Sequence, residues 1–279
     1  MYKNFVVFLT ALFIVLFGCK YENSKGQSIN ETADSEKTSD EIIKPQEEAN
    51  YKIVAEIPVP KDYSRVAVDS NSFSWYLRNL ELKTGDNVVY LYNGDKKWNQ
   101  NAHFAIINID VGTQDLQQCA DAVMRLRGEY LYLQKKYDQI HFSFLSDGKP
   151  RYYNDYVGND HGFKKFRSYM NYIFSYANTA SLDKELKPIT IDQIQAGDVF
   201  IMTGNPYGHA VTVMDIAKNK KTGKKIFLLS QSYMPAQDIH ILKNPENENL
   251  SPWYKADFEG SLVTPEWVFE KKHLKRFTD

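Results

Sequence analysis

The chain has 279 residues and a formal net charge of -1, from 34 Lys and Arg against 35 Asp and Glu. This balance excludes a strongly basic protein. Its one pronounced basic run, residues 218–225, has the composition of a solvated hairpin turn between two apolar segments. We therefore expect no nucleic-acid partner.

The beginning of the chain has the pattern of an export signal, predicted over residues 1–19. Its apolar run, residues 5–18, is short for a permanent membrane span. The run ends in Leu-Phe-Gly-Cys, which resembles the lipobox of bacterial lipoproteins and implies that Cys19 is acylated. We expect a lipid anchor in the cell envelope. Lys20 gives no acidic retention signal, which favours the outer membrane and the periplasm. An ordinary cleaved signal with an incidental cysteine is the alternative.

Residues 20–50 have the composition of a solvated tether. They are rich in Glu, Ser, Asn and Lys and show no apolar period. Such a segment buries too little apolar surface to offset the entropy of ordering it. The folded part is then predicted as a single domain over residues 51–279, a size that one core can support.

The first third of this domain combines a short helix with strands. Residues 51–60 have the pattern of an extended segment interrupted by two prolines. An apolar stripe predicts a helix within residues 72–82. Residues 87–111 predict two strands around an Asn-Gly-Asp turn.

A longer helix is predicted over residues 117–133. Asp115 is in position to cap its N-terminus, with Gln118 three residues later as in a capping box. Its apolar face repeats at helical spacing and holds Leu116, Cys119, Val123, Leu126 and Tyr130. One of the two cysteines of the chain therefore lies near the start of this helix.

Strands dominate the C-terminal third. Before them, residues 138–157 have the pattern of a hairpin and residues 161–182 that of another helix. Four apolar, β-branched segments then predict strands, at residues 197–202, 209–216, 225–231 and 237–242. Helices followed by a run of strands predict an α+β fold with an antiparallel sheet.

The position of Cys119 suits a nucleophile. Backbone N–H groups in the first turn of a helix favour the thiolate, which attacks carbonyl carbon as the thiol does not. The same N–H groups can stabilise an oxyanion. A packing role is the alternative, because free cysteines are among the most buried residues.

A base and its orienting partner are available downstream of the cysteine. His209 begins a predicted strand, and Gln231 lies near the end of the next one. Antiparallel pairing across the turn brings these two strand ends together. Strand alternation puts His209, Val211 and Val213 on one face, and if the cysteine helix packs on that face, His209 meets Cys119 at the end of the sheet.

These segments resemble the papain-like NlpC and CHAP amidases. The residues that carry the resemblance are Ala-Gly-Asp-Val at 196–199, His-Ala-Val-Thr-Val at 209–213 and Leu-Leu-Ser-Gln-Ser-Tyr at 228–233. The resemblance implies a papain-like fold, in which a cysteine-bearing helix packs on the antiparallel sheet. It also implies catalytic roles for Cys119 as nucleophile, His209 as base and Gln231 as orienter, with Gln118 beside the nucleophile at the oxyanion and substrate site.

The whole folded part also resembles an uncharacterised family of bacterial lipoproteins, which implies no activity. The leading hypothesis is a membrane-tethered cysteine hydrolase acting on amide or peptide bonds, with cell-wall peptides as one substrate class. The alternative is a lipoprotein of the same fold that binds peptide or glycan without turnover. No pair of histidines has a metal-ligand spacing, so neither a metal nor another cofactor is predicted.

Overall fold

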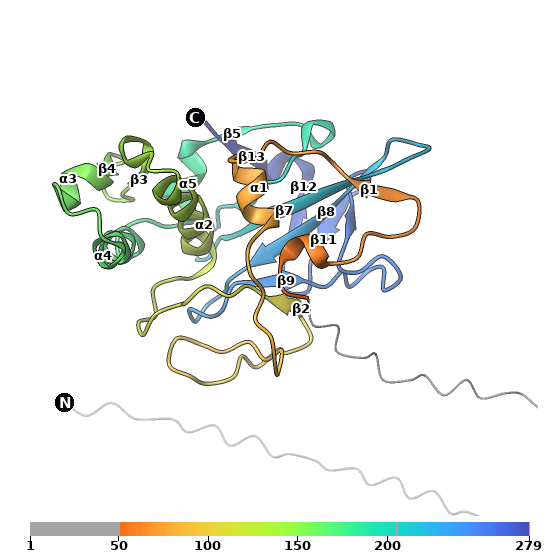
Figure 1. Ribbon diagram of the computed structural model, residues 1–279, viewed down its shortest axis with the longest axis horizontal. Coiled ribbons are helices and arrows are strands. Elements are labelled where there is room, and N and C mark those ends of the chain that lie inside the picture. Colours follow the sequence, from red (N-terminus) through yellow and green to blue (C-terminus); the bar gives the residue numbers. More distant parts are fainter. Residues whose placement is uncertain (1–50, 205, 279) are drawn as a thin grey trace, which may run out of the picture. The chain divides into compact units, whose positions relative to one another are not determined.

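An antiparallel sheet organises the chain in the computed structural model, which describes residues 51–204 and 206–278 (Figure 1). The helices are α1 (Phe73–Arg78), α2 (Cys119–Leu133), α3 (Tyr153–Val157), α4 (Phe163–Phe174) and α5 (Thr179–Glu185). The first strands are β1 (Tyr63–Arg65), β2 (His103–Ile106), β3 (His141–Ser143), β4 (Pro150–Tyr152), β5 (Leu186–Pro188) and β6 (Val199–Met202). The later strands are β7 (His209–Asn219), β8 (Lys225–Gln231), β9 (His240–Leu242), β10 (Tyr254–Lys255), β11 (Ser261–Val263), β12 (Val268–Glu270) and β13 (Leu274–Phe277).

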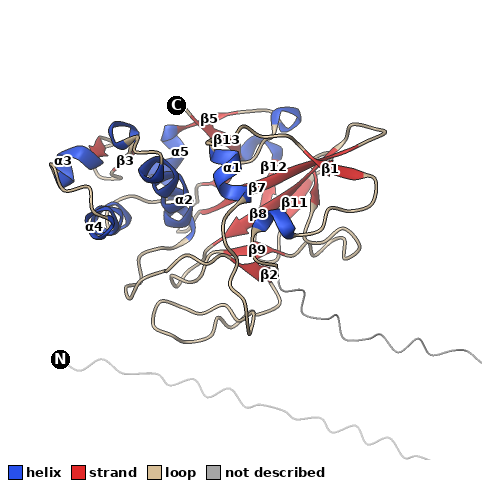
Figure 2. Cartoon of the chain, in the orientation of Figure 1, coloured by secondary structure: helices blue, strands red, loops and turns tan. Residues whose placement is uncertain are grey.

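The described residues place nine strands in the main sheet. Its central order is β2-β9-β8-β7-β6-β13-β5, with β1 paired to β7 and β10 to β8. Every pairing within the described part is antiparallel. Figure 2 shows the helices gathered mainly to one side of the strands. The predicted α+β class with an antiparallel sheet is confirmed.

The four predicted C-terminal strands all form, as β6 to β9, because their apolar and β-branched side chains are buried on both faces of the sheet. The predicted turn joins β7 to β8. Its Gly223 has φ +72°, a conformation that glycine adopts without strain. The end of β8 consequently returns to the start of β7.

Strand alternation divides the core between the two faces of this sheet. The first face meets the helices: Ala210 of β7 and Ile201 of β6 pack with α2 and α4. Met214 continues this face and packs with Ala122 and Leu126 of α2. The second face meets the C-terminal strands, through Phe200, Val211, Val213, Phe227 and Phe269. The helix that begins at the cysteine therefore covers the first face.

Three predicted elements differ from the structure, and the first is the segment of residues 51–60, which contains a 3-10 helix at Val54–Glu56 instead of being extended throughout. Within residues 87–111 one strand forms, β2, and the earlier segment makes only isolated bridges. The predicted helix over residues 161–182 is two helices, because Asn178 starts α5 by accepting hydrogen bonds from the N–H groups of Ala180 and Ser181. The hairpin of β3 and β4 is confirmed, although its last residues form α3.

The predicted signal peptide and tether, residues 1–50, lie outside the described residues, and so does Cys19. Within the described part, no helix has both the length and the apolar character that crossing a membrane requires.

Candidate functional site

The α2 helix begins at Cys119, with Gln118 as its N-cap residue. The carboxylate of Asp121 accepts a hydrogen bond from the backbone N–H of Gln118 at 3.1 Å, one half of a capping box. The prediction that Asp115 caps this helix is wrong. Asp115 instead accepts a hydrogen bond at 3.0 Å from the side-chain amide of Gln118. This bond holds the Gln118 side chain at the helix entrance.

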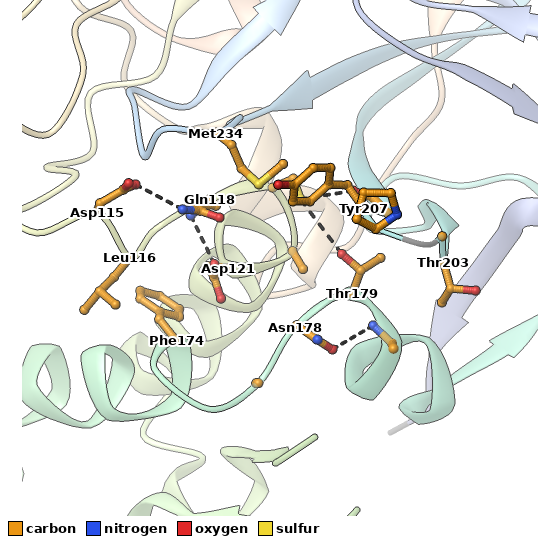
Figure 3. Close-up of a pocket in the computed structure, with 17 residues that line it drawn as sticks. Asp115, Leu116, Gln118, Asp121, Phe174, Asn178, Thr179, Thr203, Tyr207 and Met234 are labelled. Atoms are coloured by element: carbon orange, nitrogen blue, oxygen red, sulfur yellow. Dashed lines mark hydrogen bonds between the residues drawn. The ribbon is translucent and has the colours of Figure 1, made fainter. Parts of the chain in front are cut away.

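A cleft of about 320 Å³ opens at this helix terminus. Figure 3 shows its wall, to which the start of α2, the start of α5 and the segment before β7 contribute. Its lining includes Asp115, Leu116, Gln118, Cys119, Asp121, Phe174, Asn178, Thr179, Tyr207, Gly208 and Met234. The predicted nucleophile and Gln118 thus share one cavity.

The thiol of Cys119 is mostly covered, since the residue is 7% exposed. Its sulfur lies 3.9 Å from the Thr179 hydroxyl oxygen and 3.9 Å from the Gly208 carbonyl oxygen. Burial raises the pKa of the thiol, and the nearby Asp121 adds to this effect. The backbone N–H of Ala120, the Thr179 hydroxyl and the backbone N–H of Ala210 act in the opposite direction without cancelling it. The net direction is opposite to the one expected from the helix terminus.

The imidazole of His209 lies on the second face of the sheet. Its ring centroid is 5.0 Å from those of Trp267 and Tyr233 and 6.0 Å from that of Phe269. The neighbouring Ala210 faces α2. The condition for a direct meeting of Cys119 and His209 is therefore not met, because the helix packs on the alternate residues of the strand.

His209 and Gln231 meet as predicted. Nε2 of His209 is 2.9 Å from Oε1 of Gln231. The side-chain amide of Gln231 donates in turn to Glu266 at 2.6 Å, and that carboxylate pairs with the ammonium of Lys97. A carboxylate only accepts, so the amide nitrogen faces Glu266 and the amide oxygen faces His209. Nε2 of His209 therefore carries the proton, and Nδ1 is the basic nitrogen.

His240 completes this buried group on the second face. Its Nε2 lies 3.3 Å from the amide nitrogen of Gln231, and its Nδ1 lies 2.9 Å from the carbonyl oxygen of Asp238. Desolvation lowers the pKa of His209 to about 4 and that of His240 to about 3. Both rings are consequently neutral at neutral pH.

The structure brings together two of the three predicted catalytic residues directly. His209 and Gln231 share a hydrogen bond, whereas the hydrogen-bonding contacts of the Cys119 sulfur within the described part do not include the His209 ring. The thiol instead touches the backbone on either side of His209, at Gly208 and Ala210. The three residues are neighbours along one sheet end, with the resting thiol and imidazole separated by the strand.

In a comparison with protein families, the chain matches the family described as domain of unknown function (4846) over residues 53–276. The chain belongs to this family. The sequence-based resemblance to an uncharacterised family is thereby confirmed. No curated protein and no solved structure matches the chain. Membership in family 4846 assigns no activity, so any activity has to be argued from the site.

The family segment contains the predicted catalytic and oxyanion residues and also the groups that sequence reasoning missed. Lys97 and Glu266 were not predicted, and they are separated by 169 residues in the chain. A signal for Glu266 exists, because it is the acidic residue of an otherwise apolar segment, Leu-Val-Thr-Pro-Glu-Trp-Val-Phe. Charged residues in such surroundings are usually paired. Lys97 lies in a polar loop and has no comparable signal.

The described residues contain no group of three or more His, Cys, Asp and Glu side chains that could hold a metal ion. The buried cluster of His209, His240 and Glu266 is linked through the Gln231 amide instead. Its arrangement is that of a hydrogen-bonded chain. The chemistry that these side chains can perform is proton transfer and nucleophilic attack.

Proposed function

We propose that this protein is a papain-like cysteine hydrolase that acts on an amide or peptide bond. The observation that carries the proposal is the buried hydrogen bond of 2.9 Å between His209 and Gln231. It leaves Nδ1 of His209 as the basic nitrogen, at the end of the strand against which the Cys119 sulfur rests. Nucleophilic catalysis by a thiol uses an oriented neutral base, and here that base is on the strand whose backbone the helix-terminal thiol contacts.

In the proposed reaction, Nδ1 of His209 takes the proton of the Cys119 thiol, and the sulfur attacks the carbonyl carbon. Backbone N–H groups at the start of α2, with the Gln118 amide beside them, stabilise the oxyanion. The imidazolium then protonates the departing amine, and water hydrolyses the thioester. The resting thiol and ring are separated by strand β7, so the proposed proton transfer requires the end of this strand or the His209 side chain to move before attack.

The proposed setting is the cell envelope. A lipid on Cys19 would attach the protein to a membrane, by preference the outer one, and cell-wall peptides would then be accessible to the cleft. The support is the lipobox-like sequence before a polar tether. Fractionation of cells that express Cys19→Ser tests this placement, with release from the membrane as the expected result. A variant that stays acylated and membrane-bound would exclude the lipoprotein assignment.

A second function is favoured by one specific observation. Burial raises the pKa of the Cys119 thiol, so at neutral pH it is protonated to a greater extent than an exposed cysteine. A lipoprotein of the same fold that binds peptide or glycan without turnover would be consistent with such a thiol. The alternative predicts a ligand in the cleft and no chemistry.

Hydrolysis assays with matched variants separate the two functions. The parent protein should cleave muropeptides or generic peptide amides, and Cys119→Ala and His209→Ala should abolish cleavage. Gln231→Ala should reduce cleavage less, because its role is to orient the ring. Labelling of Cys119 with iodoacetamide at neutral pH supplies a second measurement: it should slow in His209→Ala. An unchanged labelling rate in that variant, with no substrate cleaved by the parent, would favour the binding protein.

A further inference from the structure

The cleft at Cys119 has a one-sided charge. Two carboxylates lie on its wall, Asp115 and Asp121, close to the helix entrance (Figure 3). Of the described residues that line it, none is Lys, Arg or His. The rest of the wall is small, neutral polar or apolar, with Leu116 and Phe174 among the apolar members. A ligand in this cleft therefore meets two acidic side chains and, among the described lining residues, no cationic one.

Asp121 has one carboxylate oxygen that the fold does not use. The residue is 7% exposed, and its Oδ2 accepts the hydrogen bond from the N–H of Gln118. Its Oδ1 is buried and has no hydrogen-bond partner among the described residues. The capping role explains the hydrogen bond of Oδ2, but it gives no role to the buried Oδ1. Burial raises the pKa of the Asp121 carboxyl well above its usual range, so a cationic donor supplied by a ligand would favour the ionised form and give Oδ1 a partner.

Asp115 is placed to share such a ligand. Both of its hydrogen bonds within the described part, from the Gln118 amide at 3.0 Å and from the N–H of Ala236 at 2.7 Å, are accepted by Oδ1. Its position is fixed by these two bonds while Oδ2 is left for other donors. Gln118 lies between the two acids. Its backbone N–H donates to Asp121 and its side-chain amide donates to Asp115.

We propose that this cleft binds a cationic group, a primary ammonium or a guanidinium, beside the Cys119 thiol. Asp121 is its buried partner, which the charge of the ligand would keep ionised, and Asp115 is its partner at the rim. A ligand carboxylate in the same place would be repelled by both acids. The identification of this cationic ligand as the substrate rests on the proposed hydrolase function, whereas the charge preference of the cleft does not.

Charged thiol reagents test the preference without any turnover. The protein is the full chain carrying Cys19→Ser, in which Cys119 is the sole thiol. Rates of modification by the trimethylammonium-ethyl and sulfonatoethyl methanethiosulfonates are each divided by the rate with 2-mercaptoethanol in solution. We expect the cationic reagent to be favoured roughly tenfold after this correction. A corrected ratio near one would overturn the proposal.

Variants assign the effect to the two acids. Asp115→Asn and Asp121→Asn should each lower the corrected ratio several-fold, and Asn at position 121 keeps an oxygen that can cap the helix. Asp155→Asn, on the exposed surface of α3, is the matched control and should leave the ratio unchanged. If the corrected ratio is high in the parent and neither cleft substitution lowers it, the charge preference has another source and the proposed site is rejected.

Protection of the thiol gives a second measurement with reagents of one shape. Pentylamine, pentanol and hexanoate each have a five-carbon alkyl tail and differ in the charge of the head group. Pentylamine should slow the reaction of Cys119 with neutral iodoacetamide, and the other two should not. Equal protection by pentanol would show an apolar cleft without a cation site. A protein that hydrolyses no amide but shows the cationic preference would retain this site and lose only the proposed function.

Discussion

The two faces of the central sheet carry different halves of the candidate site. On the helix face, Cys119 opens to a cleft with two acids in its wall. On the opposite face, the ring of His209 lies beside Trp267 and is linked through Gln231 to the buried ion pair of Glu266. One strand separates them, because successive residues of β7 point to opposite faces.

This difference in surroundings determines how the pKa of each group is shifted. Burial acts on both groups, but it raises the pKa of the Cys119 thiol and lowers that of the His209 imidazole to about 4. At neutral pH the pair is therefore a neutral thiol and a neutral base rather than a thiolate and an imidazolium. Proton transfer on attack would then be part of the chemical step, and the buried chain behind His209 would hold the acceptor in place.

The largest expected effect comes from breaking the ion pair on the second face. Lys97→Ala leaves the Glu266 carboxylate buried without its cation, since their side chains are 3% and 7% exposed. We expect a loss of about 3–5 kcal/mol in the free energy of unfolding. Urea denaturation measures it. The matched control is Lys224→Ala, which breaks an exposed pair with Asp257 and should cost under about 1 kcal/mol.

A double variant separates the stability of this pair from its positioning role. Lys97→Met with Glu266→Leu removes both charges and should recover most of the lost stability. The Gln231 amide then has no carboxylate to fix it, so the nitrogen NMR signals of His209 should no longer report a single tautomer. A double variant with the parent tautomer would show that Glu266 does not orient Gln231.

Acidification should lower the stability of the protein through the buried histidines of the second face. His209 has a folded pKa of about 4 against about 6.5 when unfolded, so the unfolded chain binds more protons between these values. Its contribution is present above pH 6.5 and is lost as the pH falls towards 4, by about 3 kcal/mol. His240, with a pKa of about 3, continues the loss below that.

The contribution of His209 to stability can be measured from the unfolding free energies of the parent and of His209→Asn at pH 7 and pH 4. The difference between the two pH values should be smaller in the variant, because its side chain does not titrate. Other carboxyl and imidazole groups contribute to both proteins and cancel in the comparison. Equal acid sensitivity in the two proteins would mean that the imidazole is not desolvated in the folded state.

The sequence predicts this fold well where the pattern is local. The strands β6 to β9 could be located because each has a run of apolar, β-branched residues between polar breaks. The break between α4 and α5 was missed, although Asn178 is a typical N-cap residue, because the aromatic periodicity runs through it. Asp115 was likewise given the capping role that Gln118 has, since both are followed by residues typical of a helix start.

The site could be predicted in part for a physical reason. The pairing of His209 with Gln231 follows from one hairpin, which a sequence pattern specifies. Alternation also shows which residues share a face with His209, but not which face the helix covers, because that depends on the packing of the whole domain. Lys97 and Glu266 come from distant loops, and their meeting is decided by tertiary structure alone.

On the helix face, the expected effects are smaller. Cys119→Ser places a hydroxyl at a site that is 7% exposed, and its neighbours, the Thr179 hydroxyl and the Gly208 carbonyl, lie at 3.9 Å from the present sulfur. A short hydroxyl reaches them poorly, so we expect a loss of about 1–2 kcal/mol in thermal or urea unfolding. Cys119→Ala, which buries no hydroxyl, is the control and should be closer to the parent in stability. A serine variant as stable as the parent would indicate that the site admits water.

The smallest effect should come from the hydroxyl beside the thiol. Thr179 lies 3.9 Å from the Cys119 sulfur and lowers the pKa of that thiol, against the larger effect of burial. Thr179→Val keeps the shape and removes the hydroxyl, so the thiol pKa should rise and alkylation at neutral pH should slow by roughly two- to threefold. Stability should change by less than about 1 kcal/mol, because one weak contact is lost. The rate of iodoacetamide labelling between pH 7 and pH 10 gives the pKa directly, and Thr179→Ser, which retains the hydroxyl, should behave as the parent does. Identical pH profiles for the valine and serine variants would mean that the hydroxyl does not interact with the sulfur, and that burial alone sets the reactivity on this face.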